Sequence, residues 1–436
     1  MKKILLLFMS LQMCLTGMSA QEAMLDINLR KAIEIAVAEN PTIKIADKEI
    51  ELKKIADKEA WQALLPTVTA DLALNHSITV AAMKTQMGEF KMGVDGTTTA
   101  TGTATLAVPV FAPAVYQNMK LTKQDILLAQ EKARSSRLSL VNQVTKAYYS
   151  ALLAKDSYEV MQRSYKTSKE NFEDVDKKYQ AGRVSEYDKI SAEVQMRAMN
   201  SSVVSAETGL NLAVLQLKVL MGINTDINVN IQDSLRSYES VLTLANAEPN
   251  MEEIENNSAI KQLDLNKAIL ERSRKTLRTN FMPTVTASLS GQYSSYSNSN
   301  WNVFGYKYSP SSTLVISASI PIFRASNWTK LQSNRVQIAQ LADTRKDTER
   351  QLSMAAQSYR RNMIKTITKL ESDREAVKQA DKAVSISSKR YDVGRGTILE
   401  LNQSETALVQ AELTYNQSIY DYLSNKADLD YTLGRE

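Results

Sequence analysis

The chain has 436 residues with 53 Lys or Arg and 48 Asp or Glu, so its formal net charge is only +5. Basic and acidic residues are intermingled, which argues against nucleic acid as a partner because no basic face or stripe is apparent. With one histidine, one cysteine, no Gly-rich phosphate loop and no carboxylates at metal-ligand spacing, the sequence suggests no catalytic, cofactor or metal site. We therefore expect that the protein is not an enzyme.

The first 20 residues predict export. They carry two lysines, an apolar stretch of about a dozen residues and a small residue, Ala20, before Gln21, as secretory signal peptides do. The only cysteine, Cys14, lies inside this segment, and its lipidation is the less favoured alternative. No later apolar run reaches the ~20 residues of a spanning helix. Any insertion into a membrane would therefore use β-structure.

The rest of the chain is interpreted as two copies of one unit. LLPTVTADLAL at 64–74 reappears as FMPTVTASLSG at 281–291, and ENPTI at 39–43 matches NNSAI at 256–260, both at an offset of 217. After the Pro-containing loops the offset becomes 212. A constant offset over more than a hundred residues predicts a tandem structural repeat.

The predicted elements follow the same order in both copies, repeat 1 at 21–221 and repeat 2 at 249–436, with a linker at 222–248. In repeat 1 we expect helices within 26–63, strands at about 66–78 and 97–110, a long helix at 115–180, a tip at 181–186 and a return helix at 187–221. In repeat 2 we expect a helix at 249–280, strands at about 283–296 and 310–322, a long helix at 327–392, a tip at 393–397 and a return helix at 398–433.

Two tracts without Pro or Gly, 114–181 and 322–393, predict the long helices, each roughly 100 Å long at 1.5 Å per residue. Their apolar positions step at 3.5 residues, and Ser168 is the only polar member of the first series. This period indicates a left-handed coiled coil. Each tract ends in Tyr-x-x-Gly-Arg, within YQAGRVSEYDKI and YDVGRGTILELN, where glycine favours a helix end. Each repeat is thus predicted to hold a long antiparallel helical hairpin.

Four stretches alternate apolar and hydroxyl-bearing residues, as Val68, Ala70 and Leu72 do between Thr67 and Thr69. Strands with one apolar and one hydroxyl-rich face fit a membrane barrel with a wet lumen. Four strands cannot close a barrel, and lipid does not tolerate open edges, so several protomers would have to contribute. The alternative is that these are ordinary hairpins capping a helical bundle.

This arrangement resembles the TolC-type outer-membrane efflux proteins, the outer-membrane factors of tripartite pumps. The likeness covers essentially the whole mature chain and rests on LLPTV and FMPTV, VPVF and IPIF, and the two tip motifs. It implies a mainly α fold with membrane β-structure, in which four strands per protomer complete a 12-stranded barrel in a homotrimer. It also implies a periplasmic helical tunnel, with the linker at 222–248 in its equatorial domain.

The resemblance implies a passive channel in the outer membrane of a Gram-negative bacterium, in contact with outer-membrane lipid. Such a channel is the exit duct of a tripartite efflux or type I secretion system. A periplasmic adaptor (membrane fusion) protein would dock on the tips and couple the duct to an inner-membrane RND or ABC transporter. The residues that match the adaptor-contacting turns are Gly182, Arg183, Val184, Ser185, Gly394, Arg395, Gly396 and Thr397.

The resemblance also implies a periplasmic gate. The closing tyrosine of the family falls on Tyr391, the latch aspartate on Asp188, preceded by Tyr187, and the first acidic ring on Glu400. Without the resemblance, Asp188 and Glu400 would be read as acids that complement a helix dipole, and Tyr391 as a packing residue of the coiled coil.

Two gate positions depart from the family. The latch arginine is replaced by Gly396, although Arg395 is adjacent, and the second acidic ring falls on Gln403, which carries no charge. We therefore expect a weaker charge gate, with three carboxylates in a trimer instead of six. The competing function is an exported coiled-coil scaffold or adhesin-like stalk without a pore, which would have no need of four long two-faced strands.

Overall fold

The computed structural model describes residues 25–86, 88–91, 93–242, 251–297 and 301–435. The predicted signal peptide and Cys14 lie outside these ranges. The chain forms two compact units: unit 1 joins the residues up to Lys48 with Glu131–Gln262 and Lys346–Glu436, and unit 2 joins Glu49–Gln130 with Leu263–Arg345. The fold is of the predicted class, mainly helical with a few strands.

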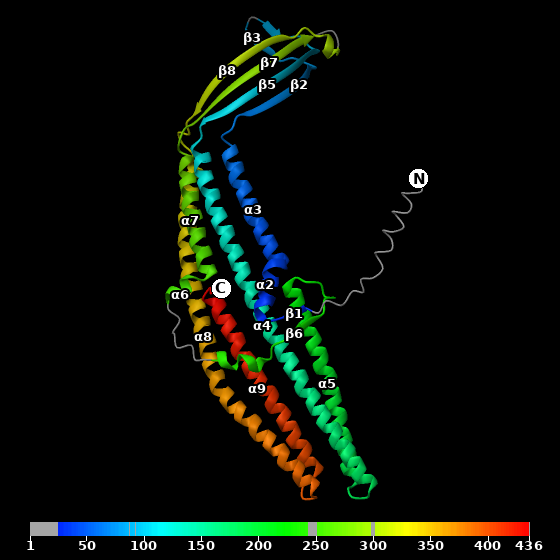
Figure 1. Ribbon diagram of the computed structural model, residues 1–436. Helices are drawn as coiled ribbons and strands as arrows, with labels where there is room; N and C mark the ends of the chain where they lie inside the picture. The colour runs from blue at the N-terminus through cyan, green and yellow to red at the C-terminus, as the bar shows by residue number, and fades with distance from the viewer. Residues whose placement is uncertain (1–24, 87, 92, 243–250, 298–300, 436) are drawn as a thin grey trace, which may run out of the picture. The chain divides into compact units, whose positions relative to one another are not determined.

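The elements occur in one order twice (Figure 1). The first series is α3 (Pro41–Gln62), β2 (Thr67–Ser77), β5 (Thr97–Phe111), α4 (Pro113–Gln180) and α5 (Glu186–Met221). The second series is α7 (Ser258–Thr279), β7 (Thr284–Ser297), β8 (Ser309–Ser319), α8 (Ala325–Asp392) and α9 (Ile398–Thr432). Helices α4 and α8 both have 68 residues. Helix α4 starts two residues before its predicted bound because proline is well suited to the first turn.

In unit 2 the long strands form one antiparallel sheet in the order β2-β5-β7-β8 (Figure 1). The register aligns one apolar row across all four strands: Val68, Leu106, Leu289 and Leu314. The adjacent row carries hydroxyl groups: Thr69, Thr105, Ser290 and Thr313. Because side chains alternate between the faces of a sheet, one face is apolar and the other is rich in hydroxyl groups. Strands β2 and β8 are the outer strands, so each has one unpaired edge within the single chain.

A small hairpin, β3 (Ala82–Thr85) with β4 (Gly88–Lys91), lies between β2 and β5 in the sequence. No strand was predicted between 78 and 97. Its strands have four residues each, too few for an alternating pattern to stand out from the flanking glycines.

Unit 1 is built around the helical hairpins and a two-stranded parallel sheet. Strand β1 (Leu25–Ile27) pairs with β6 (Val229–Ile231), and α2 (Leu29–Glu39) and the 3-10 helix η1 (Leu235–Val241) pack beside them. Large buried side chains of this core come from distant parts of the chain and include Ile27, Leu152, Leu217, Met221, Leu235, Ile419 and Tyr422. The linker at 222–248 thus contributes β6 and η1 to the core.

The single helix predicted at 249–280 is wrong in one respect, because the structure has two helices there. Helix α6 (Met251–Glu255) ends before Asn257, and α7 begins at Ser258. The Asn257 side chain accepts a hydrogen bond from the backbone N–H of Ala259 at 2.8 Å and donates one to the Thr432 carbonyl at 2.7 Å. An asparagine that bonds the backbone two residues ahead interrupts a helix and starts a new one.

The first copy contains the same interruption. Asn40, between α2 and α3, accepts from the N–H of Thr42 and donates to the Leu220 carbonyl, both at 2.8 Å. Glycines that end the return helices lie against these breaks. A Cβ on Gly222 (φ +71°) would come within 2.9 Å of the Asn40 backbone, and one on Gly434 (φ +67°) within 2.6 Å of the Asn256 carbonyl.

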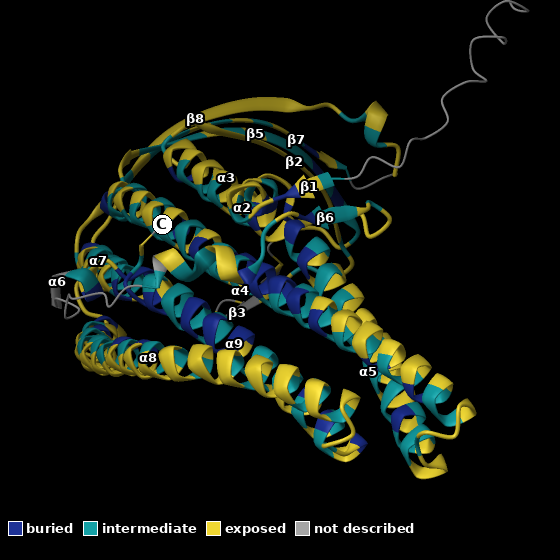
Figure 2. Cartoon of the chain, turned by 60° about the horizontal axis from the view of Figure 1, so that its bottom comes forward, coloured by how far each residue is buried: buried dark blue, intermediate teal, exposed yellow. Residues whose placement is uncertain are grey.

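Helix α5 is the one described helix that is long and apolar enough to cross a membrane, judged by length and composition alone. No such run is evident in the sequence because polar residues interrupt the apolar ones. Only 6 % of its most apolar 18-residue window is buried, and Leu212 and Val219 are 65 % and 61 % exposed. Figure 2 shows most of α5 in the colours of exposed and intermediate residues. An apolar face of α5 is therefore uncovered in the single chain.

Candidate functional site at the helical tips

Both helical hairpins of unit 1 reverse through the same backbone turn. After α4, Gly182 adopts φ +70°, its N–H donates to the Tyr179 carbonyl at 2.9 Å, and the N–H of Arg183 donates to the Lys178 carbonyl at 2.9 Å. The turn after α8 has the same two hydrogen bonds at positions 212 residues later, around Gly394. These bonds define the Schellman motif, which explains the glycine in each tip.

The return helices begin with matching capping boxes. Ser185 Oγ accepts from the N–H of Asp188, and Asp188 Oδ2 accepts from the N–H of Ser185, both at 3.1 Å. Thr397 and Glu400 form the same pair at the start of α9, at 3.2 and 3.4 Å. Both acids expected at the gate therefore satisfy backbone groups of a helix start. Glu400 also lies 3.7 Å from the guanidinium of Arg390.

The two tips pack against each other through a tip cluster of four buried residues: Val175, Ala192, Ile398 and Leu401. These come from α4, α5 and α9 and are at most 3 % exposed. Phe172, Val184 and Tyr391 pack onto them. Val184, which the resemblance assigns to adaptor contact, is thus engaged within the chain.

Tyr391 lies at the meeting point of the two hairpins. Lys178 Nζ is 5.1 Å from the centroid of its ring. Its hydroxyl is buried and has no hydrogen-bond partner within the described ranges. Burial raises the pKa of Tyr391, and the negative charge of Asp188 raises it further. The charge of the predicted latch aspartate therefore acts on the predicted closing tyrosine.

Close to the tips, Lys178 joins the two hairpins by an ion pair. Its Nζ lies 3.2 Å from Asp392 on α8 and 2.6 Å from Asp174 on its own helix. Arg395, next to the latch position, has no ion pair within the described ranges, and its carbonyl accepts a hydrogen bond from the Arg390 guanidinium at 3.2 Å. At the latch position itself, a Cβ on Gly396 would lie 3.1 Å from the Arg390 side chain, so the turn is tight there.

A buried carboxyl group lies above the tip cluster. Glu405 on α9 is 5 % exposed, and it accepts hydrogen bonds from Asn171 and, at 3.5 Å, from Ser168 Oγ, both on α4. Burial raises its pKa to about 7, although the two hydrogen bonds act in the opposite direction. Ser168, the one polar residue of the α4 seam, is explained by this contact.

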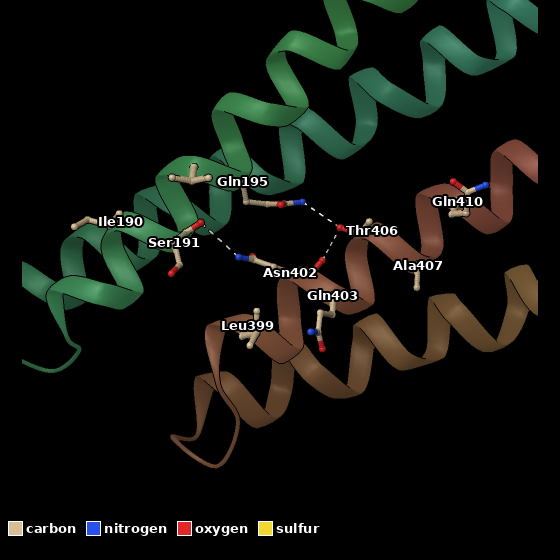
Figure 3. Close-up of a pocket in the computed structure, with 10 residues that line it drawn as sticks. Ile190, Ser191, Gln195, Leu399, Asn402, Gln403, Thr406, Ala407 and Gln410 are labelled. Atoms are coloured by element: carbon tan, nitrogen blue, oxygen red, sulfur yellow. Dashed lines mark hydrogen bonds between the residues drawn. The ribbon is translucent and has the colours of Figure 1, made fainter.

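A groove of about 650 Å³ runs between α5 and α9 beside the tips (Figure 3). Its walls are the apolar Ile190, Val194 and Leu399 and the polar residues Ser191, Gln195, Asn402, Gln403, Thr406 and Gln410, with Ala407. Two hydrogen bonds cross it, from Asn402 to the Ser191 carbonyl at 3.5 Å and from Gln195 to Thr406 at 3.4 Å. Ile190, Val194 and Leu399 are each more than half exposed, so the groove is open to a partner.

The remaining predicted residues lie near this groove or at the turns. Gln403, the substituted acidic-ring position, is part of the groove wall. Tyr187 is 64 % exposed, and Arg183 is also exposed. Sequence reasoning missed Lys178 and Glu405, because their partners lie on another helix. The polar Ser168 in an otherwise apolar seam was the only available signal for Glu405.

Comparison with known proteins identifies the family. The family model described as "Outer membrane efflux protein" matches residues 32–223 and 251–435. The chain is 21 % identical to the outer membrane protein TolC of Vibrio cholerae over 74 % of its length and 75 % of that protein. It is 22 % identical to the alkaline protease secretion protein AprF of Pseudomonas aeruginosa, over 94 % of its length and 84 % of the relative.

Solved structures agree with this assignment at the level of the fold. The CmeC outer membrane channel of Campylobacter jejuni superposes with a TM-score of 0.75 at 16 % identity, covering 93 % of this chain and 85 % of CmeC. The family match extends over both repeats and includes both tips. The chain therefore belongs to the outer membrane efflux protein family.

Proposed function

We propose that the protein is a trimeric outer-membrane channel and serves as the exit duct of a tripartite efflux or type I secretion system. The observation that carries this proposal is the four-stranded sheet. Its apolar face suits lipid, its hydroxyl-rich face suits a wet lumen, and its outer strands β2 and β8 have unpaired edges. Lipid does not tolerate such edges, so strands of neighbouring protomers are needed to pair with them.

Three copies supply the twelve strands of one closed barrel. Eight strands is the smallest membrane barrel, so one copy is too few. The uncovered apolar face of α5, with Leu212 and Val219 exposed, supports contact between protomers in the helical part. An apolar face of this extent on an exported protein is expected to be covered by another chain.

The tips form the periplasmic entrance. Tyr391 and Asp188 act at the contact between the hairpins, Lys178 with Asp392 holds the contact closed, and Glu400 supplies the single acidic ring. The position of Gln403 contributes no charge. Tyr187, Arg395 and Gly396 belong to the same entrance through the turns that hold it.

The adaptor docks on the tips and the open groove between α5 and α9. The groove combines the exposed apolar side chains Ile190, Val194 and Leu399 with amide and hydroxyl side chains, which suits an amphipathic helix of a periplasmic adaptor. Arg183 and Arg395 project as exposed cations at the turns. The adaptor would link the channel to an inner-membrane RND or ABC transporter.

Single-channel recording in a planar bilayer tests the proposal. A channel inserts and gives discrete conductance steps, whereas an exported scaffold or stalk gives none. Adaptor docking is tested separately by pull-down of the adaptor with Arg183→Glu and Arg395→Glu variants. Weaker capture by both variants supports docking at the tips, and unchanged capture argues against it.

A further inference from the structure

One long segment departs from the intermingling of charges seen elsewhere. No Asp or Glu occurs between Glu271 and Asp343, although 48 acids in 436 residues would place about eight in such a stretch. Eight basic residues fall in it: Arg272, Arg274, Lys275, Arg278, Lys307, Arg324, Lys330 and Arg335. All except Lys307 lie at the end of α7 or the start of α8, next to strands β7 and β8.

Five of the seven cations other than Lys307 are exposed and form what we call the basic junction: Lys275, Arg278, Arg324, Lys330 and Arg335. Within the described ranges none of the five has a carboxylate within 4.0 Å. The ion pair of these two helices, Arg345 with Asp264 at 2.8 Å, is formed farther from the strands. The basic junction therefore carries positive charge that the single chain does not neutralise.

Aromatic and aliphatic side chains accompany the charge. Trp328 is 63 % exposed, and its ring packs edge-on against Phe281 at 5.2 Å between centroids. At about 100° per residue, Trp328 and Arg335 fall within about 20° of one another on α8, and Arg324 directly precedes the first residue of this helix. Ile322 and Phe323, in the connection from β8 to α8, are 95 % and 80 % exposed.

We propose that the basic junction binds the headgroups of anionic phospholipids in the leaflet next to the helical ends of the strands. This inference rests on the proposed function, in which the sheet spans the outer membrane. A guanidinium pairs with a phosphate through two parallel hydrogen bonds, and Trp prefers the boundary between headgroups and acyl chains. Exposed Ile322 and Phe323 add an apolar contact that a lipid satisfies and a free phosphate does not.

The chain offers a built-in reporter for a test. Its three tryptophans are Trp61, Trp301 and Trp328, so Trp61→Phe with Trp301→Phe leaves Trp328 as the only fluorescent indole. This full-length protein is reconstituted into vesicles of unbrominated phosphatidylcholine. One set of vesicles also contains brominated phosphatidylglycerol, and the other set contains brominated phosphatidylcholine. Bromine quenches a nearby indole, so the ratio of quenching by the two lipids reports the headgroup preference at Trp328.

Brominated phosphatidylglycerol is expected to quench Trp328 more strongly, and this preference should fall as salt is raised. Arg324→Gln with Arg335→Gln should lower the relative affinity for the anionic lipid by about fivefold for each arginine. Arg324→Lys with Arg335→Lys should keep most of the relative affinity for the anionic lipid. The matched control is Arg350→Gln with Arg361→Gln, two exposed arginines elsewhere on α8, and it should keep the full preference.

Three outcomes would overturn the inference. Equal quenching by both brominated lipids, in a protein that still forms pores, refutes it and leaves the proposed function intact. Altered ion selectivity without a change in lipid preference in the Arg324→Gln, Arg335→Gln variant would place these cations in the pore. No quenching by either lipid, together with no conductance, would remove both the inference and the proposed function.

Discussion

At the tips, the same residues stabilise the local helix starts and belong to the proposed gate. Asp188 and Glu400 are both capping-box acids, in line with the role at a helix start that the sequence suggests without the family resemblance. The charge of Asp188 also raises the pKa of Tyr391. The capping role could be predicted from the sequence pattern Ser/Thr-x-x-Asp/Glu. The proximity of Asp188 to Tyr391 could not, because it depends on how two hairpins 200 residues apart in the chain pack together.

The buried Glu405 predicts a pH dependence of stability. Its pKa is raised from 4.5 to about 7 in the folded chain, so the folded state holds its proton more tightly than the unfolded state. Stability should therefore fall as pH rises from about 4.5 through 7, by on the order of 3 kcal/mol at full ionisation. Glu405→Gln should remove this fall and raise the melting temperature at pH 8.5.

Melting temperatures of the detergent-solubilised protein at pH 5.5 and 8.5 give the test for Glu405. The exposed Glu371→Gln on α8 serves as control and should melt like the wild type at both values. An unchanged difference between the two pH values in Glu405→Gln would show that another group causes it.

The contact of Lys178 with Asp392 predicts an effect on gating. Lys178→Gln removes the ion pair and the cation from the Tyr391 ring, and it should favour the open entrance by about 0.5–1 kcal/mol, since the pair is partly exposed. Tyr391→Phe should change little, because the hydroxyl has no partner in the described chain. Open probability in single-channel records measures both effects. A larger effect of Tyr391→Phe than of Lys178→Gln would contradict this assignment.

Glu400 allows charge and capping to be separated. Glu400→Gln keeps an acceptor for the Thr397 N–H but removes the charge, so cation preference should fall while the melting temperature is nearly unchanged. Glu400→Ala should lower the cation preference equally and also cost about 1 kcal/mol of stability. Reversal potentials in a salt gradient give the selectivity. Equal cation preference in wild type and Glu400→Gln would exclude Glu400 from the pore.

At the scale of elements, local patterns predict most of what the structure contains. The absence of Pro and Gly predicts helices α4 and α8, with starts within two residues of the observed ones. The alternation of apolar and hydroxyl-bearing residues predicts the four long strands. The break at Asn257 was not predicted, because an asparagine ends a helix only when its side chain finds backbone partners such as the Thr432 carbonyl. The pairing of β1 with β6 was missed for a similar reason: strands of three residues are defined by their partners.

Replacing either glycine that ends a return helix is predicted to destabilise the chain. Gly222→Ala and Gly434→Ala would place a Cβ within 3 Å of backbone atoms at a positive φ, so each should destabilise the chain by about 1–3 kcal/mol. Gly209→Ala is the control: it lies within α5, has open space around it and should stabilise by up to about 1 kcal/mol. Thermal melting ranks the three variants. Similar melting temperatures of Gly209→Ala and Gly222→Ala would show that the close approach of Gly222 to the Asn40 backbone does not restrict the side chain at position 222.

At the scale of the whole molecule, one chain leaves two kinds of surface unsatisfied. The sheet ends in the unpaired edges of β2 and β8, and α5 exposes an apolar face. The sequence predicts that further protomers contribute to a barrel, because four strands are too few to close one. The proposed number of three protomers comes from the family resemblance, since strand number alone permits any barrel of eight strands or more.

The mass of the native oligomer, extracted from outer membranes in mild detergent, tests the central claim most directly. The account predicts three protomers that stay together under partial denaturation and insert into a planar bilayer as a conducting pore. A periplasmic monomer or dimer without conductance would contradict it, because the edges of β2 and β8 would then never be paired in a closed barrel.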